Sequence, residues 1–134
     1  MKKITIYTKE TCPYCKQIKE KLTEKNIEFE NKTTEDFGEE WQDIIYVTGM
    51  PSVPTIIYGE NILVPGRDFS SPDHVLNILE NIKDSPYSES KITIERLKTL
   101  GFHINTAFGR LDQLLKQIEK KYRELFEDEE TKTE

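Results

Sequence analysis

The sequence has few cysteines, few histidines and no long apolar run. Its 134 residues include two cysteines and two histidines, so a framework of several structural disulfides is excluded. No apolar stretch reaches the about 20 residues that a membrane-spanning helix needs, and the first residues lack the apolar run of a signal peptide. These absences predict a cytoplasmic protein that is not embedded in a membrane.

Basic residues are outnumbered by acidic ones. The chain has 19 lysines and arginines against 25 aspartates and glutamates, which gives a net charge of −6. Binding of nucleic acid normally needs a basic face to meet the phosphates, so nucleic acid is not expected as a partner. Residues 127–130, Glu-Asp-Glu-Glu, form an acidic tail that we expect to be solvated.

The most informative motif that is present is Cys-Pro-Tyr-Cys at residues 12–15. Two cysteines at this spacing on the first turn of a helix can close a disulfide without opening the helix. The unpaired N–H groups and the positive end of the dipole at a helix N-terminus favour the thiolate of Cys12, and Pro13 suits the first helical position. We therefore expect Cys12 to attack disulfides and Cys15, one turn inside, to resolve the mixed disulfide.

The alternative is a structural pair, either a permanent disulfide or half of a zinc site. A zinc site needs further ligands, such as a second Cys-x-x-Cys or nearby histidines, whereas His74 and His103 stand alone in the sequence. A redox-active pair of thiols without a metal is therefore the favoured interpretation.

The pattern of apolar residues predicts both strands and helices in the first 83 residues. Strands are predicted at residues 4–8, 27–30, 55–58 and 62–64, and helices at residues 15–25, 36–47 and 72–82. Ser71 is predicted to cap the last of these helices, with Pro72 at its first position. The resulting order, βαβ-ββα, indicates an α/β domain.

Three separated motifs give residues 1–83 a resemblance to a known family. They are Tyr-Thr-Lys at 7–9 leading into Thr-Cys-Pro-Tyr-Cys at 11–15, Ser-Val-Pro at 52–54, and a loop with Gly66 before the last helix of the domain. On these motifs the segment resembles a dithiol glutaredoxin. The resemblance implies a thioredoxin-like fold, with a four-stranded mixed sheet flanked by helices, and a cis peptide bond between Val53 and Pro54.

The same resemblance implies the activity, which is reduction of protein disulfides and of mixed disulfides with glutathione as the reducing co-substrate. In the family a basic residue that corresponds to Lys9 meets the glycyl carboxylate of glutathione, and the backbone before the cis proline pairs with the peptide. The predicted glutathione-binding residues are Lys9, Tyr14, Val53, Pro54, Gly66, Arg67 and Asp68.

The loop at residues 65–69 departs from the family. Glutathione-using members tend to have Gly-Gly-x-Asp-Asp there, whereas this chain has Pro-Gly-Arg-Asp-Phe. We expect Asp68 to bind the ammonium of glutathione and Arg67 to strengthen binding of a carboxylate, while Pro65 removes a backbone amide. The departure leaves open an alternative, a glutaredoxin-like protein that is reduced by a thioredoxin reductase.

The resemblance ends at residue 83, and the remaining residues predict a helical extension. Residues 84–90 have the composition of a linker, and residues 91–134 are predicted to form a short helix that stops at Gly101, a second helix from Asn105 to about residue 127, and the acidic tail. Apolar residues recur in the second helix at spacings of four and three, as in a heptad repeat. They are Ile104, Phe108, Leu111, Leu115, Ile118, Tyr122 and Leu125.

The sequence leaves the partner of this apolar face open. The two helices can fold back on the domain or on each other, a homodimer can form through residues 104–125, or the face can bind a dedicated partner protein. The family implies disulfide-containing substrates such as ribonucleotide reductase. A second functional class is a redox-sensing or cluster-binding module recruited by the extension, although cluster binding in this superfamily favours sites with a single cysteine.

Overall fold

The computed structural model describes residues 2–83 and 90–132, with side chains described up to residue 127. Most of the predicted linker at residues 84–90 lies outside the described residues, and so do the side chains of most of the acidic tail. The chain divides into two compact units, Met1–Thr99 and Leu100–Glu134. The first unit therefore extends beyond residue 83, where the predicted domain ends.

The first unit is built on a four-stranded mixed sheet, as predicted. Its strands are β1 (Ile4–Thr8), β2 (Glu30–Thr33), β3 (Thr55–Tyr58) and β4 (Asn61–Leu63), and their order in the sheet is β2-β1-β3-β4. Strand β1 pairs parallel with β2 and antiparallel with β3, and β3 pairs antiparallel with β4. The parallel pair needs a crossover connection, which helix α1 (Pro13–Glu24) supplies.

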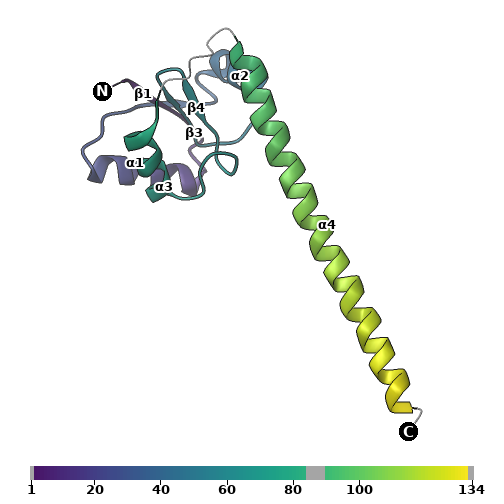
Figure 1. Ribbon diagram of the computed structural model, residues 1–134. Helices are drawn as coiled ribbons and strands as arrows, with labels where there is room; N and C mark the ends of the chain where they lie inside the picture. The colour runs from purple at the N-terminus through teal and green to yellow at the C-terminus, as the bar shows by residue number, and fades with distance from the viewer. Residues whose placement is uncertain (1, 84–89, 133–134) are drawn as a thin grey trace. The chain divides into compact units, whose positions relative to one another are not determined.

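Helices cover both faces of this sheet (Figure 1). Helices α1 and α3 (Pro72–Asn81) lie side by side on one face, and α2 (Gly38–Thr48) lies on the other. The core between the sheet and helices α1 and α3 consists of Ile4, Ile6, Ile18, Leu22, Ile56, Leu63, Phe69, Val75 and Leu79. On the opposite face the ring of Tyr7 stacks on Trp41 of α2, with 5.8 Å between the centroids. The alternation along β1 thus supplies side chains to both layers.

The ends of two helices follow from local sequence. The hydroxyl of Ser71 accepts a hydrogen bond from the backbone N–H of His74 at 3.1 Å, so the predicted cap of α3 is confirmed. Helix α1 ends before Asn26, whose φ of 55° turns the chain back. The N–H of Ile27 then donates to the carbonyl of Leu22 at 2.9 Å.

The predicted strand at residues 27–30 is wrong in its position, because pairing begins only at Glu30. Ile27 and Phe29 pack against the core cluster from the segment that leads into β2. Their apolar character reflects this packing and not the hydrogen-bonded ladder.

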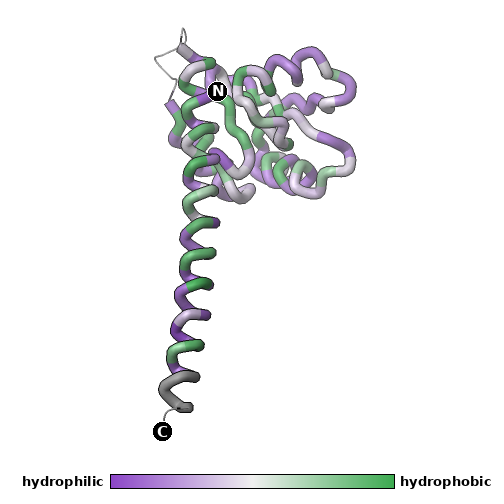
Figure 2. Tube along the Cα trace, turned by 90° about the vertical axis from the view of Figure 1, so that its right-hand side faces the viewer, coloured by the Kyte–Doolittle hydropathy of each residue, from purple (hydrophilic) through white to green (hydrophobic). Residues whose placement is uncertain are grey.

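The prediction of two helices after residue 90 is also wrong. A single helix, α4, runs over Lys91–Lys132 and includes Gly101 in its interior. Because this segment is one continuous helix, the alternative in which two helices fold back on each other is excluded. Hydrophobic and hydrophilic residues alternate along the length of α4 (Figure 2).

The start of α4 belongs to the first unit. The hydroxyl of Thr99 donates to the carbonyl of Thr48 at 2.5 Å, and the guanidinium of Arg96 donates to the carbonyl of Tyr46 at 3.0 Å. Both acceptors lie near the end of α2, where the helix leaves carbonyl groups without partners in its own backbone. Side chains of α4 supply these missing donors.

Substitution of two glycines by alanine is expected to have opposite effects. Gly101→Ala should stabilise α4 by about 1 kcal/mol, because a Cβ at this position meets nothing within 4 Å. Gly49→Ala should destabilise the first unit by about 1–2 kcal/mol, because Gly49 has a φ of 74° and a Cβ there would lie 3.2 Å from Arg96 Nη1. Circular dichroism during thermal unfolding measures both changes. A loss of helix content in Gly101→Ala would mean that the helix ends at this glycine.

Candidate functional site

Cys12 is the N-cap residue of helix α1. Its backbone is extended, with φ −93° and ψ 107°, and Pro13 is the first residue of the helix. The Sγ atom of Cys12 accepts a hydrogen bond from the backbone N–H of Cys15 at 3.1 Å. The sulfur thus takes the place that a serine or aspartate oxygen occupies in other helix caps. An N–H donor and the helix N-terminus both stabilise a negative charge on this sulfur.

Cys15 lies in a different environment one turn inside the helix. It is 1% exposed, whereas Cys12 is partly exposed, and both thiols are free in this structure. Burial raises the pKa of Cys15 to about 12, with a further contribution from its hydrogen bond with Cys12, while a backbone hydrogen bond from Lys9 acts in the opposite direction. The thiolate is therefore disfavoured at Cys15, and Cys12 is the cysteine suited to attack a disulfide.

The pairing of the strands brings Val53 and Pro54 to the same end of the sheet as Cys12. Strand β1 runs toward the cysteine motif, and its residue Tyr7 pairs with Thr55, the first residue of β3. The peptide bond between Val53 and Pro54 is cis, as the resemblance implied. Pro54 is fully buried and Val53 is half-buried. The hydroxyl of Thr55 donates to the carbonyl of Ser52 at 2.6 Å, which fixes the turn before β3.

The loop after β4 reaches this end of the sheet as well, because Leu63 pairs with Ile56 at the start of β3. Gly66 has a φ of 82°, and its N–H donates to the carbonyl of Phe69 at 2.8 Å. The ring of Phe69 is buried and lies 6.1 Å, between centroids, from the ring of Tyr14. Residues of the cysteine motif and of this loop are therefore in contact.

Two of the predicted residues differ in how much of the side chain faces solvent. Lys9 is exposed, and its carbonyl accepts the N–H of Cys12 at 3.2 Å. Tyr14 is half-buried, and burial raises the pKa of its hydroxyl. That hydroxyl has no hydrogen-bond partner among the residues that the structure describes.

Arg67, which was predicted to strengthen binding of a carboxylate, has a buried guanidinium. Its side chain is 1% exposed and lies between two carboxylates, with Nη2 2.7 Å from Asp68 Oδ2 and 2.6 Å from Glu95 Oε2. Nε also donates to Asp68, and Nη1 donates to the carbonyl of Glu95 and the hydroxyl of Thr99. Every nitrogen of the guanidinium thus has a partner within the protein. The expected contact between Arg67 and a carboxylate of glutathione does not fit this placement.

Asp68 keeps part of its carboxylate accessible. Its side chain is 18% exposed. The bonds that it makes within the described part of the chain all use Oδ2, which accepts from the N–H of Val64 at 2.8 Å and from Arg67. The other oxygen, Oδ1, is the one that can meet an ammonium group.

No pattern in the sequence pointed to Glu95 or Thr99 as site residues. Both residues are buried, and both contact Arg67 from a helix that lies beyond the resembling segment. A pair of residues 28 positions apart has no periodic pattern that predicts its contact.

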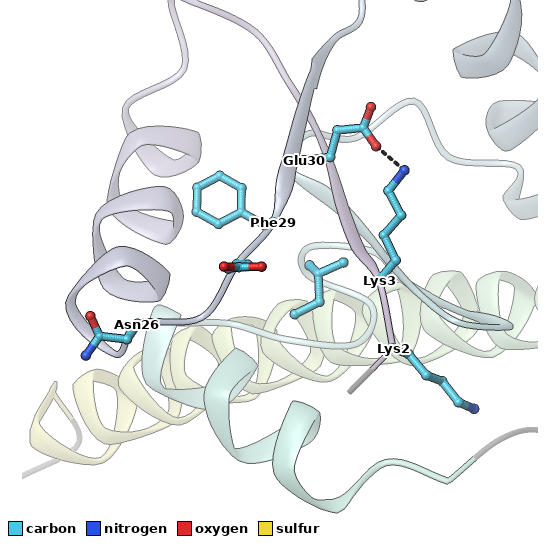
Figure 3. A pocket seen from close by; sticks show the side chains of 7 residues that line it. Lys2, Lys3, Asn26, Phe29 and Glu30 are labelled. Atoms are coloured by element: carbon cyan, nitrogen blue, oxygen red, sulfur yellow. Dashed lines mark ion pairs between the residues drawn. The ribbon is translucent and has the colours of Figure 1, made fainter.

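A hollow of about 600 Å³ lies away from the thiols. Its lining residues are Lys2, Lys3, Ile4, Asn26, Glu28, Phe29 and Glu30. They come from the start of β1 and from the segment leading into β2, and Nζ of Lys3 points to Oε2 of Glu30 at 2.5 Å (Figure 3). Cys12 follows the opposite end of β1, so this hollow is not part of the thiol site.

The described residues contain neither a cluster of metal ligands nor a helix that could span a membrane. No group of three or more His, Cys, Asp or Glu side chains within residues 2–83 and 90–132 is arranged to hold a metal ion. Within the same residues no helix combines the length and the apolar character needed to cross a membrane.

Comparisons with known proteins agree with this geometry. The family model for glutaredoxin matches residues 4–63. An uncharacterized glutaredoxin-like 8.6 kDa protein in the rubredoxin operon of Clostridium pasteurianum is 38% identical over 61 residues, which cover 46% of this chain and 81% of that protein. Glutaredoxin 3 of Escherichia coli strain K12 is 36% identical over 56 residues, which cover 42% of this chain and 68% of that protein.

A solved structure is similar in fold. The glutaredoxin grx-1 from Archaeoglobus fulgidus superposes with a TM-score of 0.50 at 20% sequence identity, and the match covers 60% of this chain and 89% of that one. The predicted thioredoxin-like fold is thereby confirmed.

The two cysteines are expected to differ sharply in alkylation. Iodoacetamide near neutral pH should modify Cys12 and spare Cys15 in the native, reduced protein, because Cys15 is 1% exposed and its pKa of about 12 leaves little thiolate. Modification of Cys15 should speed up as the pH rises toward this value. Mass spectrometry of peptides measures each site, and the unfolded protein, in which both should react, is the control. Equal rates in the native protein would contradict the assigned roles.

Proposed function

Because this chain belongs to the glutaredoxin family, we propose that it is a glutathione-dependent thiol-disulfide oxidoreductase that reduces protein disulfides and mixed disulfides with glutathione. The observation that carries the proposal is the asymmetry of the two thiols. Cys12 is partly exposed and its sulfur accepts an N–H at 3.1 Å, whereas Cys15 is buried. The sulfur of Cys12 is suited to attack a disulfide, and the sulfur of Cys15 is suited to resolve the mixed disulfide that forms.

The reaction begins when the Cys12 thiolate attacks one sulfur of the substrate disulfide. The substrate S–S bond breaks, the leaving thiolate takes a proton, and a mixed disulfide forms on Cys12. Cys15 then loses its proton and attacks Cys12 Sγ, which releases the second substrate thiol and closes the Cys12–Cys15 disulfide. Two molecules of glutathione supply the two electrons that reopen it and leave as glutathione disulfide.

A substrate that already carries glutathione needs only one cysteine. Cys12 attacks the glutathione sulfur, the protein thiol leaves, and a second glutathione reduces the Cys12 mixed disulfide. Cys15 takes no part in this route.

Several observations support a glutathione site beside Cys12. Glutathione carries two carboxylates and one ammonium, so its site needs charges of both signs around a short peptide. The exposed Lys9 provides a cation for the glycyl carboxylate, and Asp68 Oδ1 provides an acceptor for the ammonium. The backbone of Val53 before the cis Pro54 is proposed to pair with the peptide.

The proposed site also includes Tyr14 and Gly66 but omits the side chain of Arg67. The ring of Tyr14 forms an apolar wall, and the exposed backbone of Gly66 allows close approach of the γ-glutamyl end. The guanidinium of Arg67 is buried, so it acts on the site only through Asp68.

The second candidate is reduction by a thioredoxin reductase. The observation that favours it is Pro65, which has no N–H to offer at a position where glutathione-using family members have a glycine amide.

In either case we propose that the protein works in the cytoplasm on disulfide-containing proteins, of which ribonucleotide reductase is the example that the family suggests. A redox-sensing or cluster-binding module recruited by the helical extension is a weaker candidate, and cluster binding is disfavoured because Pro13 and Cys15 complete a dithiol motif.

We also propose that α4 joins two copies of this chain. The heptad residues Ile104, Phe108, Leu111, Leu115, Ile118, Tyr122 and Leu125 have exposed fractions from 43% to 66%. An apolar stripe of about three heptads is long enough for a coiled coil. An exposed stripe of this kind marks an association surface.

The charges beside the stripe favour a second copy as its occupant. Asp112 pairs with Lys116 at 2.9 Å and Glu119 with Arg123 at 2.8 Å, both within one helix. These pairs neutralise the acidic residues on one edge of the stripe, and Lys121 lies on the other edge. A strongly charged partner therefore gains nothing there, and an identical stripe is not repelled.

Substitution of each cysteine separates the proposed mechanism from its rival. Cys12→Ser should reduce all thiol transfer to the uncatalysed rate. Cys15→Ser should keep the removal of glutathione from a glutathionylated peptide largely intact, because glutathione itself resolves the intermediate. Glutathione-dependent turnover of that peptide measures both. Equal loss in the two variants would favour the reductase-fed mechanism.

The full-length chain should form a dimer whose population rises with protein concentration. Leu115→Glu should shift it to monomer, because a carboxylate in the apolar stripe cannot be desolvated without cost. Gln113→Glu, on the opposite side of α4, introduces the same residue and should leave the dimer unchanged. Sedimentation velocity at several concentrations distinguishes the two variants. A parent chain that stays monomeric at high concentration would rule out a second copy as the occupant.

A further inference from the structure

Arg67, Asp68 and Glu95 form a buried cluster of three charges. The side chains of Arg67 and Glu95 are 1% and 5% exposed, and the side chain of Asp68 is 18% exposed. The guanidinium contacts both carboxylates, at 2.7 Å for Asp68 and 2.6 Å for Glu95. Burial of these groups is tolerable only because every charge has an opposite charge beside it.

The position of Arg67 creates a difficulty for the binding of glutathione. A carboxylate that faces a guanidinium at 2.7 Å has much of its negative charge compensated, so it attracts an ammonium weakly. If Arg67 and Asp68 were alone in this loop, the pair would be neutral. The family loop carries a second aspartate where this chain has Phe69, so no other carboxylate in residues 65–69 restores the negative charge.

Glu95, on helix α4, adds a second negative charge to the pair of Arg67 and Asp68. With one guanidinium shared between two carboxylates, the cluster keeps a net charge of −1. Lys98 also faces Glu95, with its Nζ 3.3 Å from Oε1, but its side chain is 48% exposed and its charge is therefore screened by water. Asp68 has the most exposed side chain of the cluster, so it is the place where the excess negative charge can meet a ligand.

We propose that Glu95 of helix α4 offsets the charge of Arg67, so that Asp68 keeps the negative charge that binds the ammonium of glutathione. Glu95 is a positioning residue, because it acts through Arg67 and does not touch the co-substrate. The start of α4 thereby becomes part of the co-substrate site, and the charge lost from the family loop is returned by a residue outside it. This inference rests on the proposed dependence on glutathione.

The test uses three variants of the full-length chain. Glu95→Gln removes the charge and keeps the shape of the side chain. Glu124→Gln makes the same change at an exposed position of the same helix and is the matched control. The double variant with Arg67→Met and Glu95→Gln removes both charges and leaves Asp68 as the single charge of the cluster; at 18% exposure, Asp68 has the side chain of the three that is most open to water.

The readout is the dependence of the turnover rate on glutathione concentration, at low ionic strength. Glu95→Gln should raise KM for glutathione about tenfold, the size of one lost charge-assisted contact, with kcat nearly unchanged. Glu124→Gln should match the parent, and the double variant should return KM close to the parent value. A merely structural role would lower the melting temperature of Glu95→Gln without this split, and it would not be rescued by the second substitution.

Each outcome decides the matter. An unchanged KM in Glu95→Gln, or a raised KM that the double variant does not restore, overturns the inference while the proposed function stands. If Glu95→Gln does not fold, the double variant decides alone, because a KM far from the parent value contradicts charge compensation. A parent whose rate does not saturate with glutathione, yet reduces a disulfide with dithiothreitol, overturns the proposed function and this inference together.

Discussion

The pairing of β1 with β3 on one side and β2 on the other is the constraint on which the site depends. Because β1 and β3 are antiparallel, the end of β1 meets the start of β3, and the end of β4 meets the same point. The cysteine motif, the Val53–Pro54 turn and the loop at residues 65–69 therefore converge, although residues 16–64 lie between the first and the last. A slip of one residue in this register would also turn Ile4 and Ile6 out of the core, so the same burial that stabilises the sheet fixes the site.

Features that depend on a few neighbouring residues were predicted correctly from the sequence. The cap at Ser71 and the place of Cys12 at a helix N-terminus follow from a few neighbouring residues, and both are confirmed. The cis bond before Pro54 needed the family resemblance, because Met50-Pro51 is an equally eligible proline by local sequence. The stop at Gly101 was wrong because one glycine costs a helix only about 1 kcal/mol, which the surrounding helix formers outweigh.

Arg67 shows where prediction from sequence fails for a physical reason. It was expected to strengthen binding of a carboxylate of glutathione, whereas its guanidinium is enclosed by groups from β4, the loop and α4. The partners Glu95 and Thr99 lie on a helix to which the resemblance does not extend. A buried cation is compatible with folding only when such partners are present, and nothing local to residues 65–69 reveals them.

The burial of Cys15 also bears on oxidative damage. When peroxide oxidises an exposed thiolate, the sulfenic acid that forms can be oxidised further to acids that thiols cannot reduce. A thiol kept protonated and shielded from solvent is a poor target for the same oxidant, so we expect Cys15 to be oxidised more slowly than Cys12. Lying one helical turn away, it is expected to condense with the sulfenic acid and expel water, which would convert Cys12 to a disulfide that two electrons reduce back to two thiols.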